Sequence, residues 1–232
     1  MRSGSYILAA IGLAFCSSGR ADVPVADQII AKSLSSYDAA KTYQGTLVIQ
    51  VDRGDDHTRI TMDLKAENGS NGMIARSAIH MTTSTKGPSG ATSTEMLIID
   101  NGTTIFTVNP KTKEYWEQPH AEDRVSGMFR RMTENAKKSV SKLKVTQETF
   151  HGRPVYQLAG SGVSGAVRIV VDRETYQIYN AGGSSGVGAK PFRSDLTATN
   201  QLFNKSINAA AFTWSAPAGF VKHEGGGQGK QP

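Results

Sequence analysis

Two glycine-rich motifs in the sequence have the residue types of sites that bind phosphate or hold a catalytic serine. Residues 160–165 (GSGVSG) fit the dinucleotide-binding pattern G-x-G-x-x-G, and residues 182–186 (GGSSG) fit the G-x-S-x-G pattern of serine hydrolases. Both patterns need a helix directly behind them, which holds the pyrophosphate or completes the nucleophile elbow. The segments that follow, AVRIVVD and VGAKPFRSDL, lack helical periodicity. We therefore interpret the first motif as a hairpin turn and the second as a loop.

The histidines and carboxylates give no stronger chemical signal. The five histidines show no metal-ligand spacing and no H-E-x-x-H motif. His57 follows two aspartates in a predicted turn, and His80 lies on the polar side of a predicted strand. We therefore predict no enzyme activity, no catalytic residue, no metal and no cofactor. A hydrolase of envelope material, which would need a carboxylate or Ser/His cluster in a cleft, is the weakest alternative.

An aromatic hairpin is the remaining candidate for a site. Residues 100–119 (DNGTTIFTVNPKTKEYWEQP) read as two short strands around an Asn-Pro turn, and the second strand carries Tyr115 and Trp116. Neighbouring residues of a strand point to opposite faces. One aromatic residue of this pair can thus line an interior while the other faces outwards.

The periodicity of apolar residues predicts the elements that position these side chains. Residues 25–41 and 120–138 have helical spacing, and Val125, Phe129 and Ala136 share one face of the second helix. The remaining segments alternate with period two, as antiparallel strands with one wet face do. The order is one helix, about six strands, a second helix and about five or six strands, without parallel βαβ units. We predict an antiparallel α+β fold with one large sheet that curls, and with the two helices covering its open concave side.

Both ends of the chain are expected to lie outside this domain. Residues 1–21 carry a positive charge, an apolar run and small residues before position 22, which is typical of a secretory signal peptide. Cys16, the single cysteine, lies inside this segment, and Phe15 argues against its being a lipidation site. We assign residues 22–222 to the domain and residues 223–232 to a disordered glycine-rich tail. The protein is expected to be periplasmic and monomeric. Its net charge of +6 is too dispersed to indicate nucleic-acid binding.

Short motifs along most of the chain resemble one family. They are TYQGTL at 42–47, DNG at 100–102, GRPVY at 152–156 and FTWSAPAGF at 212–220. Their order is similar to that of the LolA-like periplasmic lipoprotein carriers, the outer-membrane lipoprotein-sorting superfamily. This resemblance implies an incomplete β-barrel closed by helices, with an apolar cavity that binds the acyl chains of lipids or lipoproteins.

The apolar faces of the predicted elements supply the candidate ligand-binding residues. The cavity wall is predicted to consist of Leu47, Ile49, Ile60, Met62, Leu64, Met96, Ile98, Phe106 and Trp116. A lid is predicted to consist of Val125, Met128, Phe129 and Met132. For every one of these residues, ordinary core packing is the competing interpretation.

Two functions from different classes follow from this prediction. The first is a periplasmic carrier or binding protein that holds acyl chains in an apolar cavity under a helical lid, with an inner- or outer-membrane partner protein. The second is an envelope sensor on the same fold that binds the periplasmic domain of a membrane protein. A filled barrel with an exposed interaction surface would favour the second function.

Overall fold

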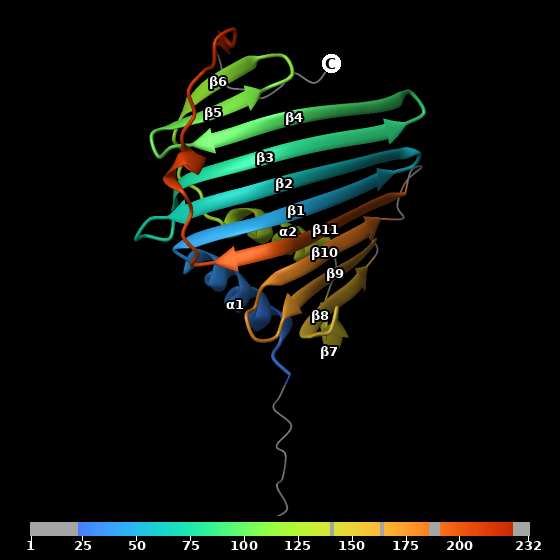
Figure 1. The fold of residues 1–232 in the computed structure, drawn as a ribbon. Coiled ribbons are helices and arrows are strands. Elements are labelled where there is room, and N and C mark those ends of the chain that lie inside the picture. The colour runs from blue at the N-terminus through green and yellow to red at the C-terminus, as the bar shows by residue number, and fades with distance from the viewer. Residues whose placement is uncertain (1–22, 140–141, 163–164, 186–190, 225–232) are drawn as a thin grey trace, which may run out of the picture.

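The computed structural model describes residues 23–139, 142–162, 165–185 and 191–224 (Figure 1). The predicted signal peptide and most of the predicted tail lie outside these ranges. The first half of the chain forms α1 (Ala26–Asp38), β1 (Thr42–Arg53), β2 (Asp56–Asn68), β3 (Ile74–Gly87), β4 (Gly90–Asp100), β5 (Thr104–Asn109) and β6 (Glu114–Pro119). The second half forms α2 (Ser126–Ser139), β7 (Lys144–Phe150), β8 (Arg153–Gly162), β9 (Gly165–Asp172), β10 (Ile178–Ser185), β11 (Phe192–Phe203), the 3-10 helix η1 (Ala209–Phe212) and β12 (Val221–His223).

The strands form one 12-stranded sheet in the order β12-β6-β5-β4-β3-β2-β1-β11-β10-β9-β8-β7. Every pair is antiparallel except β12 and β6, which run parallel. The two end strands, β12 and β7, do not pair with each other, so the sheet stays open. The predicted α+β class and incomplete barrel are therefore confirmed, and the short parallel strand β12 is a feature that the sequence pattern did not predict.

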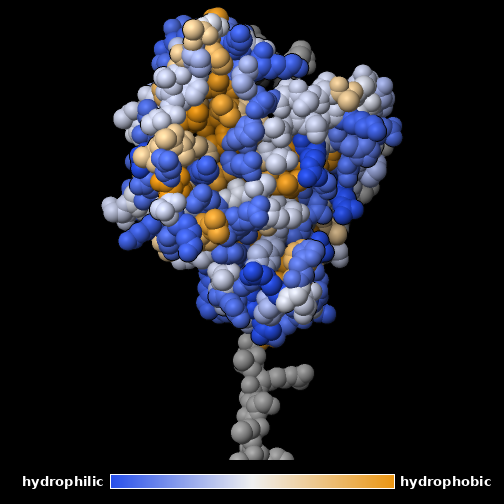
Figure 2. Space-filling model, in the orientation of Figure 1, coloured by the Kyte–Doolittle hydropathy of each residue, from blue (hydrophilic) through white to orange (hydrophobic). Residues whose placement is uncertain are grey.

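Alternation along the strands divides the sheet into two faces. Leu47 on β1 pairs with Met62 on β2 and with Ala198 on β11, and these three side chains share one face because directly paired residues point the same way. We call this the helix face, since α1 and α2 pack on it. The opposite side is the outer face, which is turned toward the viewer in Figures 1 and 2.

The helix face carries the main core. An aromatic cluster fills the space beneath the helices, with Tyr37 of α1 stacked on Phe129 of α2 at 4.3 Å between ring centroids. Tyr43 and Phe203 pack against the same tyrosine at 5.6 and 5.3 Å. Burial of such large rings is a major source of stability. Both helices lie behind the part of the sheet formed by β1 and β8–β11, and β4–β6 extend beyond them (Figure 1).

The segment between β11 and β12 crosses the outer face. We call residues 205–220 the C-terminal strap. Its Phe212 is buried and lies under the guanidinium group of Arg76, 4.9 Å from the ring centroid. Trp214 packs on Phe106 and Tyr115 at 5.3 and 5.0 Å. The strap therefore covers the β5–β6 hairpin on the side opposite the helices.

Three local predictions need correction or explanation. Residues 86–93 (KGPSGATS) have the glycine- and serine-rich composition that predicts a flexible loop, but β3 continues to Gly87 and β4 begins at Gly90. Residues 182–185 belong to β10 rather than to a loop. At the motif 160–165, β8 and β9 pair as antiparallel neighbours with Gly162 opposite Gly165, while residues 163–164 lie outside the described ranges. Gly165 has a structural role there. Its φ is +139°, and a Cβ atom at this position would lie 1.7 Å from the carbonyl oxygen of Ser184.

Candidate functional site

The structure separates the candidate residues into four groups. On the helix face of the sheet lie Leu47, Ile49, Ile60, Met62, Leu64, Met96, Ile98 and Trp116. Phe106 lies on the outer face, since it pairs with Glu117 while its neighbour Thr107 pairs with Trp116. Val125 directly precedes α2, and Phe129 lies within it. The side chains of Met128 and Met132 lie outside the described part of the structure.

Phe106 is therefore placed wrongly by the sequence prediction. It was expected to share a cavity wall with Trp116, but strand alternation sends the two rings to opposite faces. Phe106 packs under Trp214 of the C-terminal strap instead. Trp116 lies at the margin of the helix face, stacked on His223 of β12 at 5.4 Å. Neither ring fills the interior of the barrel.

The residues beneath the helices form a packed core. Leu47 and Phe129 are 0% exposed and Val125 is 4% exposed, all within one apolar cluster. Two arginines fix the helix pair at one end, where Arg124 and Arg130 approach a carboxylate oxygen of Asp38 at 3.5 and 3.7 Å. The position of α2 is thus set by aromatic packing and ion pairs, and the role of α2 as a lid stays a prediction.

Beyond this core, the helix face continues as an apolar surface on β2–β4. We call it the apolar face and define it by the half-buried residues Ile60, Ile79, Met81, Met96 and Ile98. The core cluster reaches β2 and the start of β3 but does not include these five residues. The apolar face is thus an apolar surface on the helix side of β2–β4 that continues from the core cluster without belonging to it.

Two cross-strand rows of apolar side chains make up most of the apolar face. Met62, Met81 and Met96 are directly paired across β2, β3 and β4, and the next row consists of Leu64, Ile79 and Ile98. Methionine side chains are unbranched and polarisable, so a row of them adapts to irregular apolar partners. Ile79 and Met81 were not among the predicted cavity residues, although the alternation around His80 placed them on the apolar side of their strand.

Hydroxyl groups border the apolar face at one end. Along β2, β3 and β4 the apolar side chains give way to threonines toward the β1–β2 and β3–β4 turns. These residues are Thr58, Thr83, Thr85, Thr92 and Thr94. Thr58 and Thr85 are joined by a hydrogen bond of 3.2 Å between their hydroxyl oxygens. The surface thus has an apolar part and a polar part, which match the apolar tail and the polar head of an amphiphile.

The polar groups inside the fold are structural. The hydroxyl group of Tyr37 donates to Gln201 Oε1 at 2.8 Å and accepts from the N–H of Ile178 at 3.1 Å. Desolvation by burial raises the pKa of Tyr37 well above its usual value, and burial also raises the pKa of Tyr43. Burial therefore favours the neutral form of both phenols.

Two aspartates stabilise turns. Asp100 accepts from the N–H of Gly102 at 2.9 Å and lies 2.8 Å from Nδ1 of His120. Burial opposes ionisation of Asp172, but hydrogen bonds from the N–H groups of Thr175 and Glu174 and from the Tyr179 hydroxyl outweigh it and lower the pKa of Asp172. Within the described ranges, no three histidine, cysteine or acidic residues are grouped as metal ligands would be.

Comparison with known proteins gives similarities of fold. The sequence matches no family model, and a search of curated proteins gives no significant match. MucB of Pseudomonas aeruginosa, solved in complex with MucA, is 14% identical with a TM-score of 0.46, over 82% of this chain and 60% of that chain. An uncharacterised conserved protein of Thermus thermophilus is 10% identical with a TM-score of 0.48, over 85% of this chain and 99% of that chain.

A LolA superfamily protein of Nitrosomonas europaea is also similar. It is 12% identical with a TM-score of 0.31, over 83% of this chain and 99% of that chain. The chain spans about 60% of the length of the MucB chain. In the described ranges no helix is both long and apolar enough to cross a bilayer.

Proposed function

We propose that this protein binds the acyl chains of lipids or lipoproteins on the apolar face, as a periplasmic carrier or binding protein. The observation that supports the proposal is the continuation of the helix face onto β2–β4, where the five residues of the apolar face stay half-buried outside the core cluster. Exposed apolar surfaces that adjoin a core and have a polar margin are typical binding sites.

The energetics of this site suit a reversible carrier. Each methylene group that leaves water contributes about 0.8 kcal/mol, so eight methylenes contribute at most about 6 kcal/mol. On an open face only one side of the acyl chain leaves water, so binding gains only a part of this free energy. The loss of translational freedom on binding offsets several kcal/mol more. Binding of a single chain is therefore expected to be weak enough for release to a membrane.

Neighbouring positions on β3 provide a matched test. Met81 lies on the apolar face and Thr82 on the outer face, so Met81→Asp and Thr82→Asp place the same charge one residue apart on opposite sides. We expect Met81→Asp to lower the affinity for a fluorescent fatty acid at least tenfold and Thr82→Asp to leave it within twofold. Circular dichroism and thermal unfolding verify that both variants are folded. Equal affinities of the two variants would show that the apolar face does not bind lipid.

A second function, an envelope sensor that binds a membrane protein's periplasmic domain, is favoured by the filled core beneath the helices. Tyr37, Tyr43 and Phe129 are buried there and pack against one another, which supports a protein partner more than an enclosed acyl chain. The apolar face would then be a protein interface. Native mass spectrometry of protein purified from its own envelope separates the two functions. Co-purified acyl species support the carrier, and a stoichiometric protein partner on lipid-free protein supports the sensor.

A further inference from the structure

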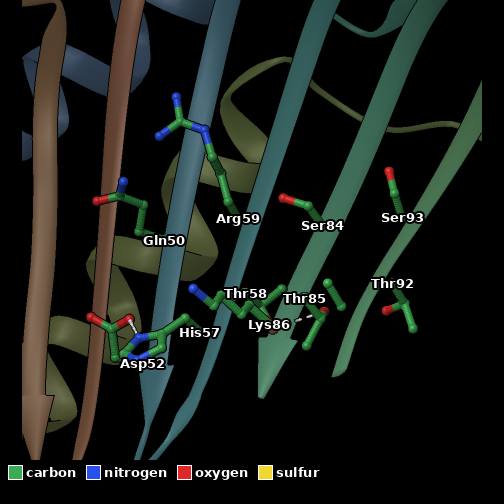
Figure 3. A pocket seen from close by; sticks show the side chains of 11 residues that line it. Gln50, Asp52, His57, Thr58, Arg59, Ser84, Thr85, Lys86, Thr92 and Ser93 are labelled. Atoms are coloured by element: carbon green, nitrogen blue, oxygen red, sulfur yellow. Dashed lines mark hydrogen bonds and ion pairs between the residues drawn. The ribbon is translucent and has the colours of Figure 1, made fainter. Parts of the chain in front are cut away.

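Two depressions lie side by side on the outer face, at the end of the sheet where β1 turns into β2. One has a volume of about 520 Å³ and is formed by β1–β4, and the other, of about 280 Å³, is formed by β9–β11. Figure 3 shows the first, with Gln50, Asp52, His57 and Arg59 on strands that have α2 behind them. This end of the sheet, on the right in Figure 2, is predominantly hydrophilic.

Strand register joins the two depressions into one surface. Gln50 on β1 pairs with Arg59 on one side and with Asp195 on the other, and Asp52 pairs with His57 and with Arg193. One cross-strand row therefore runs through Arg168, Asp195, Gln50, Arg59, Ser84 and Ser93. The adjacent row runs through Ser184, Arg193, Asp52, His57 and Lys86. We call these two rows the polar track.

The polar track has an excess of positive charge. Its four cations face only two carboxylates, Asp52 and Asp195. Asp52 is occupied by His57 at 2.7 Å, and Asp195 by Arg193 at 3.4 Å.

The other cations of the track are not neutralised within the described chain. Arg59 and Lys86 have no hydrogen-bond or ion-pair partner there. Arg168 donates to the neutral side chain of Asn180 at 2.8 Å. Three cations are thus available to an anionic ligand, and guanidinium groups bind carboxylates by paired hydrogen bonds.

The remaining lining of the track selects among anionic ligands. Glycine, alanine and serine lie between the cations, so the floor is low and carries hydroxyl groups and the amide of Gln50. No aromatic residue lines either depression in the described chain, whereas single-stranded nucleic acids are bound by aromatic stacking. Apolar side chains of a peptide would likewise find no pocket for an anchor. Hydroxyl, amide and guanidinium groups in rows suit the ring hydroxyls and carboxylates of an acidic sugar chain.

We propose that the polar track binds an acidic polysaccharide, a chain of uronic acid units laid across the strands. The track crosses seven neighbouring strands, from β9 to β4, and six spacings of about 4.8 Å make it about 29 Å long. A pyranose unit is similar in length to one strand spacing. The track therefore accommodates about six units, with carboxylates placed toward Arg168, Arg59 and Lys86. This site is independent of lipid binding, because it lies on the opposite face of the sheet.

Calorimetry with oligogalacturonides of two to eight units tests the proposal. We expect affinity to rise with length up to about six units and then to level off. Cello-oligosaccharides of the same length, which are neutral, should bind at least tenfold more weakly. Added salt should weaken binding, because the cations of the track are exposed.

Variants that remove single cations locate the binding surface. Arg59→Gln and Lys86→Gln should each lower the affinity for the six-unit chain several-fold, and the double variant at least tenfold. Lys65→Gln is the matched control, since Lys65 is an exposed cation on the outer face of β2 outside both depressions. All four proteins should have the same melting temperature.

Several results would overturn the proposal. The proposal is wrong if the six-unit chain does not bind, if Lys65→Gln lowers the affinity as much as Arg59→Gln does, or if the neutral chains bind equally well. Equal affinity for a polyglutamate peptide of matched charge would show a surface that attracts any anion. The Met81→Asp variant should bind the sugar chain like the unmodified protein, so that failure of lipid binding and failure of sugar binding are distinguishable.

Discussion

Replacement of Phe129 by alanine tests whether α2 is part of the core. The ring is 0% exposed and stacked on Tyr37 at 4.3 Å, and Tyr37 in turn contacts Tyr43 and Phe203. Truncation of a buried phenylalanine costs about 3–5 kcal/mol, because it removes apolar burial and leaves a cavity. At about 2–4 °C per kcal/mol for a chain of this size, the melting temperature should fall by about 6–20 °C.

Urea unfolding monitored by circular dichroism measures this loss as a change in midpoint at a constant m-value. Arg131→Ala, an exposed position on the same helix, is the control and should change the free energy of unfolding by less than about 0.5 kcal/mol. If Phe129→Ala also changes it by less than about 1 kcal/mol, α2 is not packed on the core in solution. The reasoning that makes α2 a core element would then be refuted in favour of a mobile lid.

Two further predictions concern local features of the second half of the sheet. Tyr179→Phe removes a hydrogen bond to Asp172, a residue whose pKa is lowered in the folded state. The ionised carboxylate of Asp172 therefore stabilises the fold above the unfolded pKa, and this stability is lost as pH falls through the folded pKa. The variant should therefore be less stable than the unmodified protein at pH 7, and urea unfolding should show this difference shrinking toward pH 3. Gly165→Ala should destabilise by well over 1 kcal/mol, because its Cβ would collide with the Ser184 carbonyl group. Gly152→Ala, where φ is +78° but no atom lies within 4 Å, should cost clearly less, and an equal melting temperature for the two glycine variants would contradict this account.

The element pattern was largely predictable from the sequence, because period-two and period-3.6 spacing are local properties. The six strands before α2 and the open antiparallel sheet follow from them. The turn at residues 88–89 was harder to predict. Thr85, Lys86, Thr92 and Ser93 are polar on both faces, and a hairpin tip beyond the core resembles a loop in composition.

The candidate site was predictable only in part. Alternation placed Ile60, Met96 and Ile98 on the correct face, since each lies in a strand with a clear period. Phe106 was misplaced because its strand is apolar on both faces, with the C-terminal strap covering one of them. That cover comes from Trp214, more than 100 residues later, and no local pattern reveals it. Whether the space under α2 is filled depends on how Tyr37, Tyr43 and Phe203 meet, which is likewise a long-range property.

The pairing of β1 has a kinetic consequence. On one side β1 pairs with β2 through a short turn, and on the other side it pairs with β11, where Leu47 meets Ala198 across about 150 residues of chain. Contacts of such sequence separation form late, because a long loop must close before they stabilise the fold. The antiparallel strands β2–β6 and β7–β10 can each pair early, but the two halves of the sheet are joined only when β11 forms. A nascent chain that ends before residue 192 would hold two unjoined half-sheets, each with an open edge at which aggregation begins.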